Sequence, residues 1–417
     1  MRLKTLVVLI VSILLIYGCG KRVSKTYIDN QQTLLGAYIN GDFAQAFGYA
    51  DTFAKEVEKD YPQDVYVALL ERAKVAMDAG VYDKSIKDFQ IAEKRFLDIE
   101  GTIALSEEGS ALFLDDTTKE YEAEPLEKLM ISPYLALTYW LSGSFNDARI
   151  ERNRTMVKIN QYIEAGGEET LYLENPFARY ISGIIYENEQ KFQDAKIEYT
   201  KIKKTAPHLA KFIDADLERV KKDTDLSDLV VFVDIGRSPI KFEVKHDPIE
   251  VNNVRVEIVY AEMRAVQYNV KKAKVVIDGK EAGETMLLHN MADTVLKQFE
   301  ENKPKMLKSL IARAAVKAAA QAGGNKLAEQ GGTVGAIGSL ISLGSKVSSA
   351  LERADLRSWV TLPAQVQMFR AYKLGAGKHT IKLIYLSDNG NVLGESPQKE
   401  VTIGEKQIGV THFRVVK

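Results

Sequence analysis

The sequence lacks the residues on which most catalytic and metal sites depend. Cys19 is the single cysteine among 417 residues, so the chain forms neither an internal disulfide nor a multi-cysteine metal site. The five histidines are scattered, and no pair has the spacing of a metal-binding motif. The sequence also contains no Gly-x-Ser-x-Gly nucleophile motif and no phosphate-binding Gly-x-x-x-x-Gly-Lys-Ser/Thr loop. We therefore predict a non-enzymatic protein with no catalytic residue, no metal and no cofactor.

A strong net charge is missing as well. The 56 Lys and Arg residues nearly balance the 57 Asp and Glu residues, which leaves a formal net charge of −1 at pH 7. No overall field attracts nucleic acid, so we expect no nucleic-acid partner. The hydrophobic fraction of 46% over this length can bury more than one core, which predicts two domains rather than one.

The start of the chain predicts export and a lipid anchor. The apolar run Leu6–Ile16 is shorter than the ~20 residues that a membrane-spanning helix needs, which indicates a signal peptide over residues 1–18. Ile16-Tyr17-Gly18-Cys19 resembles a bacterial lipobox, in which the cysteine is acylated and becomes the mature N-terminus. The resemblance implies a lipid on Cys19 and a tether over residues 19–30. Gly20 stands where an aspartate would retain the protein at the inner membrane, so we expect the outer membrane, facing the periplasm. An uncleaved signal anchor is the alternative.

Residues 31–222 have apolar residues at helical spacing. Asn175-Pro176 and Ser132-Pro133 each place a capping side chain before a proline, which predicts helix starts. A turn residue followed at a fixed distance by a small residue recurs in four phrases: Gly41-Asp42-Phe43 then Ala46, Gly80-Val81-Tyr82 then Ser85, Gly143-Ser144-Phe145 then Ala148, and Gln190-Lys191-Phe192 then Ala195.

This phrase resembles the tetratricopeptide repeat. In that motif the small residue lets the second helix of a pair approach the first closely. The resemblance implies an α-solenoid of stacked helix pairs, whose concave groove would bind envelope proteins or peptides. An ordinary helical bundle is the alternative, although a bundle has no need for a small residue at a fixed distance after each turn.

Residues 229–417 change to β-strand patterns directly after an acidic stretch. Predicted strands include Leu229–Val233, Ile240–Val244, Val254–Tyr260, Ala273–Ile277, Trp359–Leu362, Lys378–Leu386, Lys399–Ile403 and Val410–Val415. Asp278-Gly279 and Asn389-Gly390 predict tight hairpins, and the hairpin sequences are similar to PEGA-type envelope modules. Together the two halves predict an α+β chain with an N-terminal α-solenoid and a C-terminal antiparallel β-sandwich.

A helical-hairpin insertion is expected at about residues 291–356. Lys303-Pro304 would begin its first helix, and Gly323-Gly324 would end it. Gly331, Gly335 and Ser339 form a small-residue stripe that would let helices approach closely, which favours contact with a second subunit as a homo-oligomer. Dipping into the outer-membrane leaflet and a plain hairpin packed on the sandwich are the alternatives.

Two groups of residues are candidates for binding a partner. Arg149 and Arg152 share a helical face and could bind an acidic partner, although the favoured alternative is that they neutralise the glutamates at positions 122–127 or are simply solvated. Tyr186, on the first helix of the last repeat, is a further candidate for partner binding. Asp355, Arg357 and Trp359 alternate along a predicted strand entry, which would place all three on one recognition surface. A local ion pair with Trp359 packed over the arginine is the favoured alternative here.

The whole chain resembles a family of uncharacterised bacterial lipoproteins that join tetratricopeptide-like repeats to a β-rich domain. The resemblance lies in Ala148–Arg152, Asn175–Tyr180 and above all Ala354–Ala364. Some members are encoded near lipoproteins that activate penicillin-binding proteins, which implies a role in envelope assembly and no known catalytic activity. We therefore predict a protein-binding scaffold. The alternatives are a wall-active enzyme whose carboxylates are dispersed in the sequence, and an oligomer inserted in the membrane.

Overall fold

A computed structural model describes residues 25–103, 120–166, 174–221, 227–245, 249–251, 254–256, 259–328 and 354–417. The predicted signal peptide, the lipidation site Cys19 and the stripe of Gly331, Gly335 and Ser339 lie outside the described residues. Among the helices in these ranges, none combines the length and the apolar character that crossing a bilayer requires.

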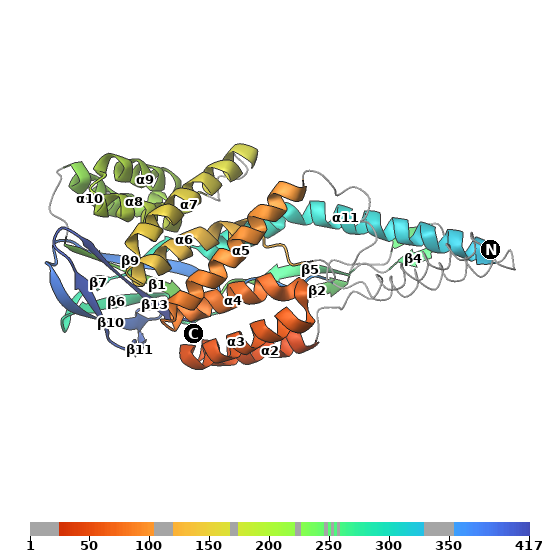
Figure 1. The fold of residues 1–417 in the computed structure, drawn as a ribbon, viewed down its shortest axis with the longest axis horizontal. Coiled ribbons are helices and arrows are strands. Elements are labelled where there is room, and N and C mark those ends of the chain that lie inside the picture. Colours follow the sequence, from red (N-terminus) through yellow and green to blue (C-terminus); the bar gives the residue numbers. More distant parts are fainter. Residues whose placement is uncertain are drawn as a thin grey trace.

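The N-terminal half is an array of helices in which each helix packs against the next (Figure 1). The helices are α2 (Lys25–Ile39), α3 (Phe43–Asp60), α4 (Val65–Asp78), α5 (Tyr82–Ile103), α6 (Pro125–Leu141), α7 (Phe145–Gly166), α8 (Pro176–Asn188), α9 (Phe192–Thr205) and α10 (Ala210–Lys221). The first eight form four antiparallel pairs, because a short turn joins α2 to α3, α4 to α5, α6 to α7 and α8 to α9.

The four turns have the same construction. Each contains one residue with a positive φ, namely Gly41, Gly80, Gly143 and Gln190. The small residue that follows is completely buried between the two helices in every pair: Ala46, Ser85, Ala148 and Ala195. Close packing at these positions explains why the phrase recurs, and the stacked helix pairs that it predicted are present.

Prolines mark the helix starts less reliably. Asn175 caps α8 as predicted, and its side chain accepts a hydrogen bond from the Ala178 amide at 3.1 Å. The start predicted at Ser132-Pro133 is wrong, because α6 begins at Pro125 and continues through Pro133. A capping box between Glu124 and the third helical residue provides the start, and apolar packing on all sides keeps the helix intact past the second proline.

The C-terminal half contains thirteen strands within the described ranges. They are β1 (Asp228–Ile235), β2 (Ile240–Lys245), β3 (Ile249–Val251), β4 (Val254–Val256), β5 (Val259–Arg264), β6 (Lys272–Ile277), β7 (Lys280–Glu284), β8 (Met286–His289), β9 (Gln365–Ala371), β10 (Gly377–Leu386), β11 (Val392–Glu395), β12 (Lys399–Ile403) and β13 (Ile408–Val415). One sheet has the order β13-β1-β9-β8 and a second has β11-β10-β6-β7, with β12 also paired to β10. Pairs β2-β5 and β3-β4 form two small ribbons.

The two larger sheets pack face to face, but the sandwich is not purely antiparallel as predicted. Strand β1 runs parallel to β13 and antiparallel to β9. Two parallel strands need a long connection, and here the connection from β1 to β13 includes all the other strands and α11. In addition, the predicted strand Trp359–Leu362 is irregular, and the true strand begins only at Gln365.

Strand β1 is buried on both of its faces. Its odd-numbered residues, such as Val231 and Val233, pack in the core between the two sheets. Its residues Val230 and Phe232 point the other way and join the core of the helical array. The molecule therefore has three layers, with helices covering one sheet and a second sheet covering the other face of that sheet. The largest apolar core crosses the sequence boundary near residue 222, so the packing does not separate there into two units.

Helix α11 (Met291–Ala328) extends away from the sheets, next to the β3-β4 ribbon (Figure 1). It starts where the insertion was predicted to start, but it passes through Pro304 and through Gly323-Gly324 without ending. Lys303-Pro304 predicted the wrong start because Asn290 caps the helix earlier, with its side-chain oxygen accepting from the Asp293 amide. The second arm of the predicted hairpin lies outside the described residues.

Candidate functional site

The predicted binding groove is already occupied by the chain itself. The first helices of the pairs, α4, α6 and α8, are buried along almost their whole lengths, whereas α3 and α9 bury only one face. The sheet β13-β1-β9-β8 and the segment Ala354–Ala364 cover the inner side of these helices in one shared core. The expectation of an open concave groove is therefore wrong, because the chain's own apolar sheet face supplies the burial that a partner would otherwise have supplied.

Two buried glutamates hold the main chain of the segment Ala354–Ala364. The Glu71 carboxylate accepts hydrogen bonds from the amides of Val360 at 2.8 Å and Thr361 at 3.1 Å. The Glu127 carboxylate accepts from the Trp359 amide at 2.7 Å. Burial raises the pKa of Glu71 to about 7, and burial also raises the pKa of Glu127 above its usual range. These carboxyl groups hold the amides of a segment that has no regular secondary structure.

The predicted recognition residues Asp355, Arg357 and Trp359 do not form an exposed surface. Arg357 is 1% exposed and binds Asp355 at 2.7 Å and Asp64 at 2.9 Å. Trp359 is fully buried and packs edge-on against Phe89. The local ion pair was therefore the correct alternative. The segment is irregular rather than a strand, so the alternation of sides that the prediction assumed does not apply to it.

The structure brings Arg149, Arg152 and Tyr186 together around an internal acid. Both arginines bind Glu189 at the α8 end, with Arg149 Nε 2.6 Å from the carboxylate and Arg152 also in contact. The Arg152 guanidinium lies 3.8 Å above the centre of the Tyr186 ring. The favoured alternative named the wrong glutamates, since the arginines bind Glu189, which lies in the turn between α8 and α9, and not the glutamates at positions 122–127. Arg149 keeps 42% of its side chain exposed, and Arg152 is buried.

A buried ion network joins the helices to the sheet around Arg370 of β9. This guanidinium is fully buried and lies 3.0 Å from Glu187, 3.0 Å from Asp216 and 2.7 Å from Asp228. The three acids come from α8, α10 and β1. Arg219 also contacts this group, so two cations face three carboxyl groups. Burial, together with Glu187, raises the pKa of Asp216, whereas the arginines lower that of Glu187 against the effect of burial.

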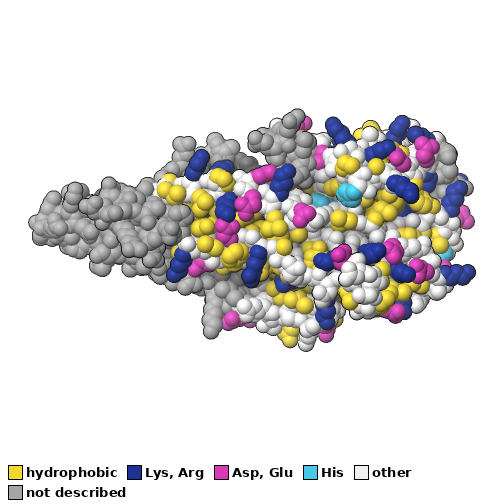
Figure 2. Space-filling view, turned by 180° about the vertical axis from the view of Figure 1, so that it is seen from behind, with side chains coloured by type: hydrophobic (Ala, Val, Ile, Leu, Met, Phe, Trp, Pro, Cys, Tyr) yellow, Lys and Arg dark blue, Asp and Glu magenta, His cyan; other side chains and the backbone are white. Residues whose placement is uncertain are grey.

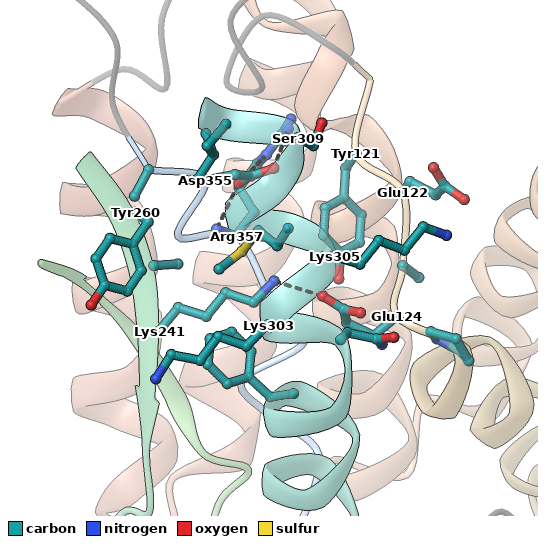
Figure 3. A pocket seen from close by; sticks show the side chains of 18 of the residues that line it. Tyr121, Glu122, Glu124, Lys241, Tyr260, Lys303, Lys305, Ser309, Asp355 and Arg357 are labelled. Atoms are coloured by element: carbon teal, nitrogen blue, oxygen red, sulfur yellow. Dashed lines mark hydrogen bonds and ion pairs between the residues drawn. The ribbon is translucent and has the colours of Figure 1, made fainter. Parts of the chain in front are cut away.

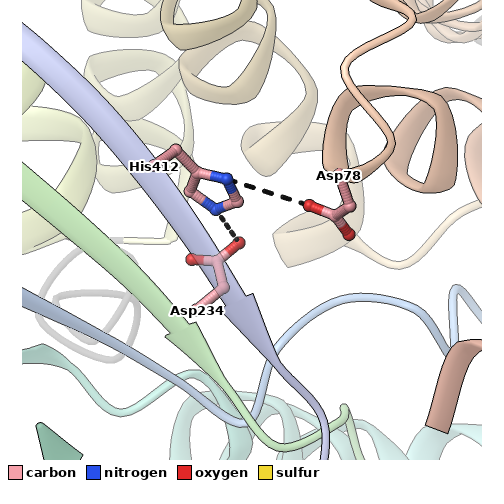
Figure 4. Close-up of side chains that lie close together, drawn as sticks. All are labelled: Asp78, Asp234 and His412. Carbon is pink, nitrogen blue, oxygen red and sulfur yellow. Dashed lines mark ion pairs between the residues drawn. The ribbon is translucent and has the colours of Figure 1, made fainter. Parts of the chain in front are cut away.

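A second buried network contains the best arrangement of metal-ligand atoms among the described residues. One ligand atom each from Asp78, Asp234 and His412 lies within 4.8 Å of the others (Figure 4). However, Lys74 Nζ is 2.6 Å from Asp78 and 3.1 Å from Asp234, and Arg414 lies nearby. Burial alone would raise the pKa of Asp234, but Lys74, His412 and Arg414 together lower it. The ammonium group already occupies the position of a cation, so this donor set does not fit a metal ion.

An open cleft of about 560 Å³ lies between α11 and the helical array (Figure 3). We call it the α11 cleft. Its walls are α11, the extended residues Glu120–Pro125 and strand β5, and its floor includes the buried side chains of Phe299, Leu310 and Ala354. Charged side chains surround that apolar floor in pairs, with Lys241 3.0 Å from Glu124 and Lys128 3.1 Å from Glu122. Burial lowers the pKa of Lys241, but Glu124 and other acids raise it overall, so the amine is charged.

The molecular surface has no single-signed region in the view of Figure 2. Basic and acidic side chains alternate there, with hydrophobic side chains between them. This distribution agrees with the near-zero net charge and gives no support to an electrostatic partner such as nucleic acid.

Comparison with solved structures finds a distant likeness to a tetratricopeptide repeat protein. A crystal structure of a tetratricopeptide repeat protein from Parabacteroides merdae ATCC 43184 is similar to part of the chain, with 14% sequence identity and a TM-score of 0.33. The match covers 48% of this chain and 62% of that protein, which is less than two thirds of its length. A likeness at this level adds nothing to what the helix pairs themselves show. No family model matches the sequence, and no curated protein is similar to it.

Sequence reasoning missed the buried charges that join the two halves. Lys74 and Glu71 lie in α4 among apolar residues on every side, and Asp234 ends the apolar run of β1. The available signal was a charged residue in a segment whose other residues are apolar on every face. Such a residue is buried and must have a buried partner, which indicates a contact between segments. The partner of Glu71 could not be predicted from the sequence, because it is the Val360 amide, 289 residues away along the chain.

Proposed function

We propose that this chain is a lipid-anchored, non-catalytic protein of the bacterial cell envelope, of the lipoprotein family that its sequence resembles, and that it binds another envelope protein. The lipobox-like Ile16–Cys19 and the balanced charge support the location and the class of partner. We place it on the periplasmic face of the outer membrane.

The use of the buried acids supports a role without catalysis. Glu71 and Glu127 bind main-chain amides, Asp78 and Asp234 bind Lys74, and the acids around Arg370 bind arginines. A general acid or base needs access to a substrate, and these groups are committed to holding segments of the chain together. The alternative of a wall-active enzyme therefore gains no support from them.

The α11 cleft is the site that we propose for the partner, and it is the observation that carries this function. It combines an apolar floor with a charged rim, which is the usual composition of a protein-binding surface. The inner face of the helix pairs cannot serve, because the sheet covers it.

In-cell photo-crosslinking tests the proposed site. A photoreactive residue is placed at Glu122 or Lys305, which are exposed on opposite walls of the cleft, and at the exposed Lys196 of α9 as a matched control. We expect the two cleft positions to crosslink to the same envelope protein and the control position to crosslink to none. Equal crosslinking from all three positions, or none from the cleft, would contradict the site.

Lipidation is tested separately with Cys19→Ala. We expect the variant to lose its acyl groups and to leave the membrane fraction, because nothing else in the described chain is predicted to hold it there. Acylation of the variant at another position would disprove the anchor without affecting the cleft.

A further inference from the structure

Strand β13 is the outermost strand of its sheet and pairs with β1 alone. Main-chain groups that face β1 belong to odd-numbered residues. The Gln407 carbonyl accepts from the Ser227 amide at 2.9 Å, and the Val415 carbonyl accepts from the Gly236 amide at 3.0 Å. Successive residues of a strand direct their amide and carbonyl groups to opposite edges, so the even-numbered residues of β13 direct theirs away from β1.

Side chains cover part of this outer edge. The Ile408 amide donates to Asn188 Oδ1 at 2.8 Å, and the His412 carbonyl accepts from Lys399 Nζ at 2.7 Å. Between them, Val410 has an outward amide and carbonyl for which no described residue is a partner. The edge therefore keeps the donor and acceptor pattern of a strand, which is a template for pairing with another chain.

Two adjoining clefts follow this edge. One of about 440 Å³ lies along residues 407–412, and one of about 540 Å³ lies along residues 413–417, with Lys399 on the border of both. We call the two together the β13 groove. Strand β12 lines one wall. The other wall comes from the turns of the four helix pairs, through Gly41, Tyr82, Gly143 and Asn188. The recurring turns of the repeat thus meet beside β13, where α6 also approaches the strand (Figure 1).

The depth of the groove limits what can occupy it. Residues 407–412 line the first cleft, and the side chains of Ile408 and Val410 pack inward in the helical core. Because a wall stands on each side of this edge, we take its occupant to be one extended chain rather than the sheet of a second folded copy. Apolar side chains, including Phe43 and the 47% exposed Leu393, line the second cleft. They favour a segment that carries apolar residues at alternate positions.

We propose that the β13 groove binds an extended polypeptide segment of a partner protein, which joins the sheet as a strand beside β13. The segment pairs with Val410 and replaces the Lys399 ammonium at the His412 carbonyl. A strand of the same length as β13 spans about 26 Å, at about 3.3 Å per residue. The inference rests on the proposed function in one respect, that the partner is a polypeptide, and it uses a different surface from the α11 cleft.

Two variants of the full chain separate strand addition from other binding. Val410→Pro removes the outward amide, and it leaves the ladder with β1 because that amide faces away from β1. Thr402→Trp places a large side chain in the groove. Thr402 is exposed on the groove wall, so this change does not replace a side chain of the core. Lys196→Trp, at an exposed position of α9 away from both the groove and the α11 cleft, is the matched control.

The probe is a library of random nine-residue peptides selected on the immobilised chain, followed by fluorescence polarisation with the synthesised winners. We expect alternating apolar residues in the winners and slower hydrogen exchange over residues 407–415 when they bind. Val410→Pro and Thr402→Trp should each weaken binding by at least about tenfold, and Lys196→Trp should leave it unchanged.

Three results would overturn the inference. One is the absence of any selected peptide with a Kd below about 1 mM. Another is unchanged binding to both groove variants. The third is self-association of the chain that Thr402→Trp abolishes, which would make a second copy the occupant. Crosslinking from the α11 cleft should persist in Thr402→Trp, so a failure of this inference is distinct from a failure of the proposed function.

Discussion

Replacing Arg370 with methionine tests whether buried ions hold the helices on the sheet. Arg370 binds acids from α8, α10 and β1, and its side chain is fully buried. Methionine fills a similar volume but leaves these acids with Arg219 as their nearest cation. Removal of one partner from a buried ion pair costs about 3 to 5 kcal/mol, which is a large part of a typical folding free energy of about 5 to 15 kcal/mol.

The loss should depend on pH with a definite sign. Without Arg370, the pKa values of the buried acids rise in the folded chain. An acid whose pKa is higher in the folded chain than in the unfolded chain binds protons preferentially when folded, so the folded state gains stability as the pH falls. The deficit of Arg370→Met relative to the wild type should therefore shrink as the pH is lowered from about 7 to about 5.

Urea unfolding followed by circular dichroism measures this deficit. Lys221→Met is the matched control, because it removes a cation from the exposed pair with Glu218, where the lysine side chain is 51% exposed. We expect the control to change the unfolding free energy by less than about 0.5 kcal/mol. A deficit below about 1 kcal/mol for Arg370→Met, or one that does not vary with pH, would refute the reasoning.

Four further substitutions test local packing, backbone strain and burial. Gly183→Ala should destabilise the chain by about 1 to 3 kcal/mol, because the new Cβ would lie 2.5 Å from the Tyr199 ring. Gly48→Ala is its control: the new Cβ in α3 meets nothing within 4 Å, so this change should stabilise the chain by about 0.5 to 1 kcal/mol. Urea unfolding measures both effects. Gln190→Gly should raise stability by about 1 kcal/mol, since a φ of 62° strains a residue that has a Cβ; an unchanged unfolding midpoint would contradict this. Burial raises the pKa of Glu71 to about 7, so the folded state carries a buried charge above that pH and loses this destabilising charge below it. The stability of the wild type relative to Glu71→Gln should therefore increase by roughly 2 to 3 kcal/mol from pH 8 to pH 5. A constant difference over a pH series of urea titrations would count against this prediction.

The helix pairs could be predicted because their signals are local. A glycine at the turn and a small residue five positions later both act within one pair, as Gly143 and Ala148 do. The hairpin at Asp278-Gly279 was predictable for the same reason, since both residues have a positive φ. Ser132-Pro133 shows the limit of local signals, because tertiary packing carried α6 through the proline.

The candidate sites could not be predicted in the same way. Arg357 and Trp359 carried a resemblance to a family, and the sequence left open a recognition surface and a local ion pair, but it gave no sign that both residues are buried under the helices. Exposure depends on which layer covers a segment, and that is decided by elements hundreds of residues away. The α11 cleft and the β13 groove each form only where separate segments meet.

The sequence by itself determined where helices pair, where most strands run, and where a lipid anchor is expected, because each depends on residues within a few positions of one another. Only the tertiary structure decided that the sheet fills the inner face of the repeats, that β1 pairs in parallel with β13, and that Arg370 gathers three acids. These outcomes depend on burying apolar faces and charges together across the whole chain, and a charge buried in one segment has a free energy that its distant partner sets.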